Sequence, residues 1–192
     1  MKRYGIIYAD PPWAYGRPSN PSMGQKAYCT MPLDELKRMG VERLSEDNAL
    51  LFMWSSGALL QDSLDLMEAW GFKYRTIAFV WNKKRPAFGK YTMPMCEMVL
   101  VGKRGSIPKP RGAQNVRQHF SIAKGAHSVK PEIFRESISK MFPTQNKLEM
   151  FARSSVDGWD VFGNEAPDSI NIPMRSKLEM RQIERKKICR IR

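Results

Sequence analysis

The sequence predicts an α/β protein with a mostly parallel sheet and helices on both faces of that sheet. Short apolar segments typical of buried strands alternate with segments of helical periodicity, and this alternation extends through most of the 192 residues. In addition, 42% of the residues are hydrophobic, which is enough for a sizeable core in a chain of this length. In such sheets ligands bind at the carboxyl ends of the strands, so we expect the functional residues there.

The elements of the first half follow from apolar runs and their boundaries. They are a strand over 5–9, a loop over 13–30, one or two helical turns over 33–39, a strand over 49–54 and a helix over 60–70. The first strand ends where Pro11 and Pro12 cannot donate to a ladder. Apolar residues recur at spacings of four, three and three in the helix, which Gly71 would end with a positive φ.

The second half continues the alternation. It contains strands over 76–81 and 98–101 with a basic loop over 83–94 between them, a loop over 102–129, a helix from about Pro131 to Pro143, and a short strand over 159–162. Phe134, Ile138 and Met141 form the apolar stripe of this helix. Residues 148–152 alternate around one acidic residue. We therefore expect one domain over 1–165, followed by a basic tail over 166–192.

Composition excludes several functional classes. The longest unbroken apolar run, residues 49–54, is far too short to span a membrane, and no signal-type apolar core follows the first residues, so we expect a cytoplasmic protein. The three widely spaced cysteines form neither a disulfide framework nor a metal motif, and we expect reduced thiols. Because the chain has only two histidines, we expect no zinc or multi-histidine iron site; magnesium held by carboxylates is not excluded.

The chain is strongly basic, because 32 lysines and arginines face 19 acidic residues and the formal charge is +13. A polyanion is therefore the expected partner. The basic loop interleaves cations such as Lys83 and Arg85 with aromatic rings, a pattern that suits phosphates and bases but also fits a solvated loop. The tail over 175–192 is either a nucleic-acid-binding arm or a solubilising end. Tyr28 and Trp13 are candidates to stack on an extruded or single-stranded base.

Asp10, Pro11, Pro12 and Trp13 follow the first strand directly, and we take them as candidate catalytic residues. Asp10 offers a carboxylate acceptor, Pro11 a carbonyl oxygen whose orientation the next proline helps to fix, and Trp13 a flat apolar face. Two aligned acceptors suit a planar exocyclic amine, because they hold its N–H bonds in a geometry that frees the nitrogen lone pair. The plainer alternative is a turn that begins with an aspartate.

This tetrapeptide resembles the DPPW signature of adenine-N6 methyltransferases of the MT-A70 type, and the resemblance extends from about residue 4 to residue 165. Further blocks resemble the family in order, over 28–31, 51–54, 69–72, 81–83, 97–105, 127–132, 148–153 and 159–165. The resemblance implies a Rossmann-like methyltransferase whose catalytic segment precedes its cofactor segment, with S-adenosylmethionine as the methyl donor. In agreement with that order, no GxGxxG loop follows the first strand.

The resemblance also implies roles for individual residues. Lys130 would hold the methionine carboxylate of the cofactor, and Asp10 would lie near the methionine amino group as well as the target amine. The residues expected along the methionine and ribose path are Glu149, Arg153, Asn164 and Glu165. Each has a plainer interpretation: Lys130 could be solvated, Glu149 could pair with Arg153, and 164–165 could be an ordinary turn.

Two features depart from larger relatives. Only nine residues precede Asp10, whereas larger relatives carry an upstream segment that helps enclose the adenine of the cofactor, so we expect that wall to come from elsewhere. Ser155 and Val156 stand where some relatives place a His-Asn pair.

The expected function is therefore transfer of a methyl group to the N6 amine of adenine in nucleic acid. DNA is favoured over RNA, because a compact and very basic chain without a recognisable RNA-binding module resembles the small prokaryotic or phage members. A homodimer or a related partner subunit is compatible with the sequence. The alternatives are a catalytically silent subunit that binds nucleic acid, a small basic structural protein, and an enzyme that methylates glutamine.

Overall fold

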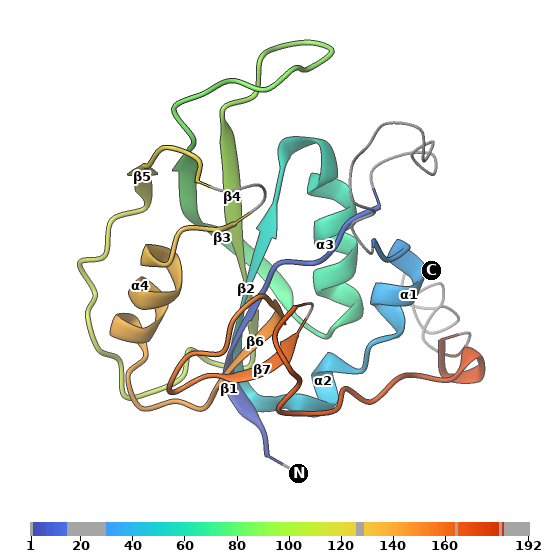
Figure 1. Ribbon diagram of the computed structural model, residues 1–192. Coiled ribbons are helices and arrows are strands. Elements are labelled where there is room, and N and C mark those ends of the chain that lie inside the picture. Colours follow the sequence, from blue (N-terminus) through green and yellow to red (C-terminus); the bar gives the residue numbers. More distant parts are fainter. Residues whose placement is uncertain (1, 15–29, 126–128, 164, 181, 183–192) are drawn as a thin grey trace.

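The computed structural model describes residues 2–14, 30–125, 129–163, 165–180 and 182. Seven strands within these ranges form one sheet in the order β5-β3-β4-β2-β1-β6-β7 (Figure 1). Their bounds are Tyr4–Ala9 for β1, Ser45–Ser55 for β2, Lys73–Asn82 for β3, Cys96–Arg104 for β4, His119–Ser121 for β5, Lys147–Ala152 for β6 and Asp160–Gly163 for β7. Only β4 runs antiparallel to its neighbours, so the prediction of a mostly parallel sheet is confirmed.

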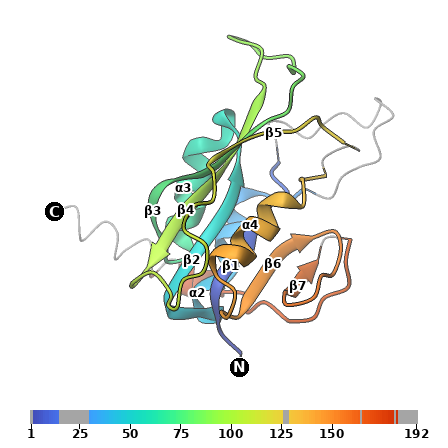
Figure 2. The same ribbon diagram turned by 90° about the vertical axis from the view of Figure 1, so that its left-hand side faces the viewer.

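Helices cover both faces of the sheet, as predicted (Figures 1 and 2). The helices are α1 (Leu33–Arg38), α2 (Val41–Leu44), α3 (Leu60–Ala69) and α4 (Ile133–Met141). Side chains alternate along β1, so that Ile7 packs with α1 to α3 in one core cluster and Ile6 packs with α4 in the other. This period of two is why a strand with six buried residues in a row needs helices on both sides.

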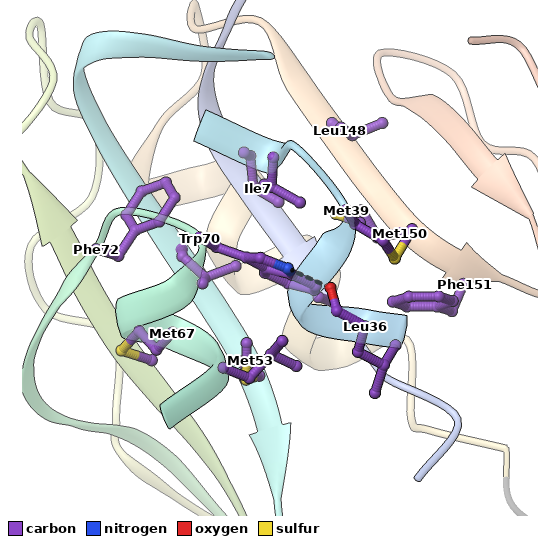
Figure 3. Packing of buried hydrophobic residues seen from close by; sticks show 14 of the residues in the cluster. Ile7, Leu36, Met39, Met53, Met67, Trp70, Phe72, Leu148, Met150 and Phe151 are labelled. Atoms are coloured by element: carbon purple, nitrogen blue, oxygen red, sulfur yellow. Dashed lines mark hydrogen bonds between the residues drawn. The ribbon is translucent and has the colours of Figure 1, made fainter. Parts of the chain in front are cut away.

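The first core cluster joins α1 and α3 to the sheet (Figure 3). The indole Nε1 of Trp70 donates to the carbonyl oxygen of Leu36 over 2.9 Å, and both side chains are fully buried. Gly71 follows with a φ of +84°, so the predicted glycine stop of this helix is confirmed. The hydrogen bond satisfies the polar atom of the indole, which allows so large a ring to be buried.

The structure corrects the sequence prediction between residues 96 and 129. β4 begins at Cys96 and ends at Arg104, so it is longer at both ends than the predicted strand, and β5 lies inside the predicted loop. β5 has only three residues, pairs in parallel with β3 and has no buried side chain. So short a segment has no apolar run or alternation, and its strand conformation depends on the edge of β3.

The segment after β7 packs back onto the helices. Arg175 is only 4% exposed, and its guanidinium donates to the carboxylate of Glu42 and to the backbone carbonyls of Lys37 and Ala69. Its own backbone N–H donates to the carbonyl oxygen of Arg38 over 2.7 Å. Arg175 is therefore a buried anchor, so it is not one of the free charges of the basic tail. Residues 181 and 183–192 of that tail lie outside the described residues.

The topology places one edge of the sheet at the site. The parallel strands β1, β2, β3 and β6 end at this edge, and β4, which runs the other way, begins there. In the described ranges we find no helix that is long and apolar enough to cross a membrane.

Candidate functional site

Asp10 lies directly after β1, where the first strand leaves the sheet. Its backbone N–H donates to the carbonyl oxygen of Met150 on β6, and the N–H of Trp13 donates to the carbonyl of Pro11 over 2.9 Å. This second bond closes the turn that the two prolines predict. The Pro11 carbonyl oxygen keeps a second lone pair, because each carbonyl oxygen carries two.

A partly buried ion pair joins this turn to the segment before α4. Nζ of Lys130 lies 2.9 Å from Oδ2 of Asp10 and 3.5 Å from Oε2 of Glu97. The carboxylate of Glu97 also accepts from Nζ of Lys83 over 2.7 Å. Two ammonium groups and two carboxylates therefore alternate in one network at the edge of the sheet, and their formal charges sum to zero. The structure thus brings Asp10, Lys130 and Lys83 together, as the sequence expects for the first two.

Sequence reasoning missed Glu97 as a site residue. It lies at the start of β4, opposite Trp81 in the antiparallel ladder with β3. Because β4 runs against its neighbours, its amino-terminal end meets the carboxyl ends of the parallel strands. Two signals were available: the family-like block over 97–105 begins at this residue, and an acidic residue precedes an apolar run, which alone is too common to identify a site.

Burial and mutual charge determine the ionisation of this network. Burial raises the pKa of Asp10 above the usual aspartate value, although the nearby Lys130 ammonium partly counteracts this. Burial alone would lower the pKa of Lys130, but the carboxylates of Asp10 and Glu97 outweigh it and raise that pKa. Burial likewise opposes ionisation of Glu97, but Lys130 and Lys83 outweigh it and lower the pKa of Glu97. Lys130 thus stays cationic at neutral pH.

An aromatic ring lies beside the lysine. Nζ of Lys130 lies 5.1 Å from the centre of a Trp54 ring, a distance typical of a cation–π contact. The indole Nε1 of Trp54 donates to the hydroxyl of Tyr8 over 2.6 Å, and both rings are buried in the second core cluster. The ammonium is therefore held over a rigid aromatic surface that is supported by β1 and β2.

Trp13 lies mostly inside the first core cluster, with 8% of its surface exposed. Trp13 forms an isolated β-bridge with Met31. The backbone N–H of Met31 donates to the carbonyl oxygen of Pro12 over 2.8 Å. Trp13 therefore fixes the position of the turn, and little of its ring is exposed for stacking on a base. The other stacking candidate, Tyr28, lies outside the described residues.

The predicted cofactor residues on β6 and after β7 form two further ion pairs. Glu149 pairs with Arg135 of α4 over 2.5 Å, a partner that the sequence did not suggest. Arg153 lies 3.6 Å from Glu165. Burial raises the pKa of Glu149, and Arg135 partly offsets this. Asn164 lies outside the described residues.

The predicted substrate residues Lys83 and Arg85 differ in their surroundings. The Lys83 side chain is only 17% exposed and is turned toward Glu97, whereas Arg85 is exposed on the loop between β3 and β4. Among the described residues, no group of three or more histidine, cysteine or acidic residues could hold a metal ion. Cys96, the one cysteine in these ranges, is an exposed free thiol.

The fold, with an acidic turn after β1 and a partly buried lysine before α4, is that of a Rossmann-like methyltransferase. The chain belongs to the MT-A70 family, whose profile matches residues 4–165. Over 197 aligned residues it is 42% identical to the Type II methyltransferase M.MunI of Mycoplasma sp., an alignment that covers 93% of this chain and 84% of that protein.

Relatives in plants and animals are more distant and much longer. The chain is 28% identical to the N(6)-adenosine-methyltransferase MT-A70-like protein of Arabidopsis thaliana, with 84% of this chain and 24% of that protein covered. It is 24% identical to the human N(6)-adenosine-methyltransferase catalytic subunit METTL3, with 86% and 28% covered. The chain thus spans about a quarter of the length of these two proteins.

Proposed function

We propose that this protein transfers a methyl group from S-adenosylmethionine to the exocyclic N6 amine of adenine in nucleic acid, and that DNA is the preferred substrate. The observation that carries this proposal is the ion pair between Asp10 and Lys130 at the carboxyl edge of the sheet. It joins the DPPW turn to the cofactor segment, which is the arrangement that methyl transfer to an amine requires.

The charges of the site fit the methionine part of the cofactor, which is a zwitterion. The Lys130 ammonium is suited to the methionine carboxylate, and Asp10 and Glu97 offer carboxylates to the methionine amino group. In the structure these protein groups satisfy one another, so a zwitterion can replace these contacts without leaving a buried charge unpaired. When bound, S-adenosylmethionine supplies an electrophilic methyl group on a sulfonium ion.

The residues of the turn act on the acceptor amine. The amine donates one hydrogen bond to the Asp10 carboxylate and the other to the free lone pair of the Pro11 carbonyl oxygen. These contacts hold the nitrogen so that its lone pair points away from the plane of the base, and they stabilise the positive charge that develops on nitrogen. Pro12 and Trp13 keep the turn rigid, which preserves the alignment of the two acceptors.

The second group of ion pairs is suited to the remainder of the cofactor. Arg153 and Glu165 lie together, directly after β6 and β7, and Glu149 lies within β6. Carboxylates in this position accept hydrogen bonds from ribose hydroxyls in related sheets. We assign Glu149, Arg153, Asn164 and Glu165 to the methionine and ribose path on this basis.

The preference for DNA is supported by the degree of similarity. The relative that is 42% identical and of comparable length is named a Type II methyltransferase, whereas the two proteins named for N(6)-adenosine share only 24–28%. The net charge of +13 suits either polyanion.

The decisive experiment is transfer of a labelled methyl group from S-adenosylmethionine to duplex DNA, single-stranded DNA and RNA, with nucleoside analysis of the products. We expect label in N6-methyladenine, with the highest rate on DNA. Asp10→Asn serves as the matched inactive control. An absence of label from every substrate, despite salt-sensitive nucleic-acid binding, would support a catalytically silent subunit instead.

A further inference from the structure

The loop between β3 and β4 projects from the sheet beyond the edge that carries the site (Figures 1 and 2). We call residues 83–95 the β3–β4 finger. Two backbone hydrogen bonds tie its arms together, from Lys83 N–H to the Met95 carbonyl and from Ala87 N–H to the Pro94 carbonyl, each over 2.9 Å. At the tip, a Cβ on Gly89 would lie 2.2 Å from the carbonyl oxygen of Thr92, so the turn closes tightly around a residue without a side chain. The finger therefore has a defined shape.

The tip exposes two aromatic rings completely. Phe88 is 102% exposed and Tyr91 is 97% exposed, the highest values for any large hydrophobic side chain in the described ranges. Met93, beside them, is 61% exposed. Single exposed apolar side chains are ordinary, but two fully exposed rings on one short loop indicate a binding surface.

Cations surround these rings. Lys84, Arg85 and Lys90 are exposed, and no acidic residue occurs between positions 83 and 95. Rings and cations therefore alternate along the finger, as bases and phosphates alternate along a nucleic-acid strand. A second copy of this chain is a poorer match for this surface, because each copy carries a net charge of +13.

The base of the finger is part of the site. Lys83 begins the finger and pairs with Glu97, which lies two residues beyond its end and also contacts Lys130. The base of the finger is therefore linked through Glu97 and Lys130 to the turn that contains Asp10. This placement favours nucleic acid over a membrane surface, which would also attract rings and cations.

We propose that the β3–β4 finger grips the nucleic-acid strand beside the target adenine, with Phe88 and Tyr91 stacked on bases and Lys84, Arg85 and Lys90 against phosphates. The proposal rests on the proposed function only in identifying the bound strand as the methyl acceptor. It assigns to the finger the stacking surface that the buried ring of Trp13 does not provide.

The test compares the double variant Phe88→Ala/Tyr91→Ala with the wild-type protein in binding a short fluorescent single-stranded DNA of mixed sequence. We expect affinity to fall roughly 30-fold or more, because the variant loses two base–aromatic stacks and each changes affinity by roughly 5- to 150-fold. The slope of affinity against salt should stay the same. Tyr74→Ala, an aromatic truncation at the opposite end of β3, is the matched control and should bind like the wild type.

Two further variants separate stacking from other contacts. Phe88→Leu/Tyr91→Leu keeps apolar side chains without ring faces and should bind as weakly as the alanine variant; restored affinity would overturn the stacking. Lys84→Ala/Arg85→Ala/Lys90→Ala should reduce the salt slope by about 0.7 for each lost phosphate contact on single-stranded DNA. An unchanged slope would show that these three cations do not contact phosphates.

Binding is measured without methyl transfer, so the two proposals can fail separately. If the wild type methylates adenine and the alanine variant binds DNA within about twofold of it, the finger proposal is wrong and the proposed function stands. If no substrate is methylated but the alanine variant loses DNA affinity, the proposed function is wrong and the finger proposal stands. Light scattering completes the test: a mass that halves in the alanine variant would make the finger a contact between copies and would overturn the proposal.

Discussion

Nζ of Lys130 lies 2.9 Å from Oδ2 of Asp10, although 120 residues separate the two in the chain. Asp10 follows β1 near the middle of the sheet, and Lys130 precedes α4 on one face of it. The pair thus links the segment that we assign to the acceptor amine to the segment that we assign to the cofactor. Glu97 supports the pair from β4, because it contacts the same ammonium group.

Replacing Lys130 by alanine should weaken cofactor binding much more than nucleic-acid binding. The variant loses a charge-assisted bond to the methionine carboxylate, and such bonds contribute about 1.5–3 kcal/mol, or roughly 10- to 100-fold in affinity. Calorimetric titration with S-adenosylmethionine and a separate DNA titration measure the two effects. Equal losses in both titrations would show that Lys130 does not bind the cofactor.

Replacing Asp10 by asparagine should reduce kcat about 100- to 1,000-fold, because it removes one preorganised charge from the acceptor site. The amide keeps the shape of the side chain, so thermal stability should change by about 1 kcal/mol or less. Steady-state methylation assays and thermal unfolding of the same sample give both values. A folded variant with wild-type turnover would exclude Asp10 from the mechanism.

Activity should fall on acidification at a higher pH than an ordinary aspartate would give. Asp10 carries the negative charge that stabilises the developing positive charge on nitrogen only when it is ionised, and burial raises its pKa above the usual 3.8. The folded carboxyl holds its proton more tightly than the unfolded one. Its contribution to stability is therefore complete below the unfolded pKa and is lost as the pH rises through the folded pKa.

A pH–rate profile at saturating cofactor measures this acidic limb, and the free energy of unfolding over the same pH range is the control. An acidic limb at or below pH 3.8 in a folded sample would contradict the assignment.

The pair of Arg135 and Glu149 allows structural and cofactor roles to be separated. The two side chains are 7% and 15% exposed, so Arg135→Met leaves a buried carboxylate unpaired and should cost about 3–5 kcal/mol. The double variant Arg135→Met/Glu149→Met should recover much of that stability. It should still bind S-adenosylmethionine more weakly than the wild type, because the ribose acceptor is missing. Wild-type cofactor affinity in a stable double variant would limit Glu149 to a structural role.

The buried guanidinium of Arg175 should contribute measurably to stability. Arg175→Met removes its bonds to Glu42 and to two backbone carbonyls, which should lower the free energy of unfolding by about 2–4 kcal/mol. Thermal unfolding should show a midpoint lower by roughly 5–15 °C. Arg85→Met, at an exposed position, is the control and should leave the midpoint unchanged. Equal midpoints for both variants would show that the anchor is unimportant.

Much of the fold was predictable because its elements have local signals. β1 and β2 are apolar runs bounded by prolines or polar residues, and α3 and α4 have apolar stripes of helical period. The DPPW turn was identifiable for the same reason, since its residues are adjacent in sequence. β5 was not, because three residues at the edge of a sheet have no periodicity of their own.

The sequence by itself determined the α/β class, the turn at Asp10 and the basic, aromatic composition of the finger, because adjacent residues encode these properties. Only the tertiary structure decided which charges meet. It placed Glu97 at the site through the antiparallel direction of β4, paired Glu149 with Arg135, and buried Arg175 against α1 to α3. The physical reason is that ion pairs between distant segments depend on strand order and direction, which the local pattern of side chains does not specify.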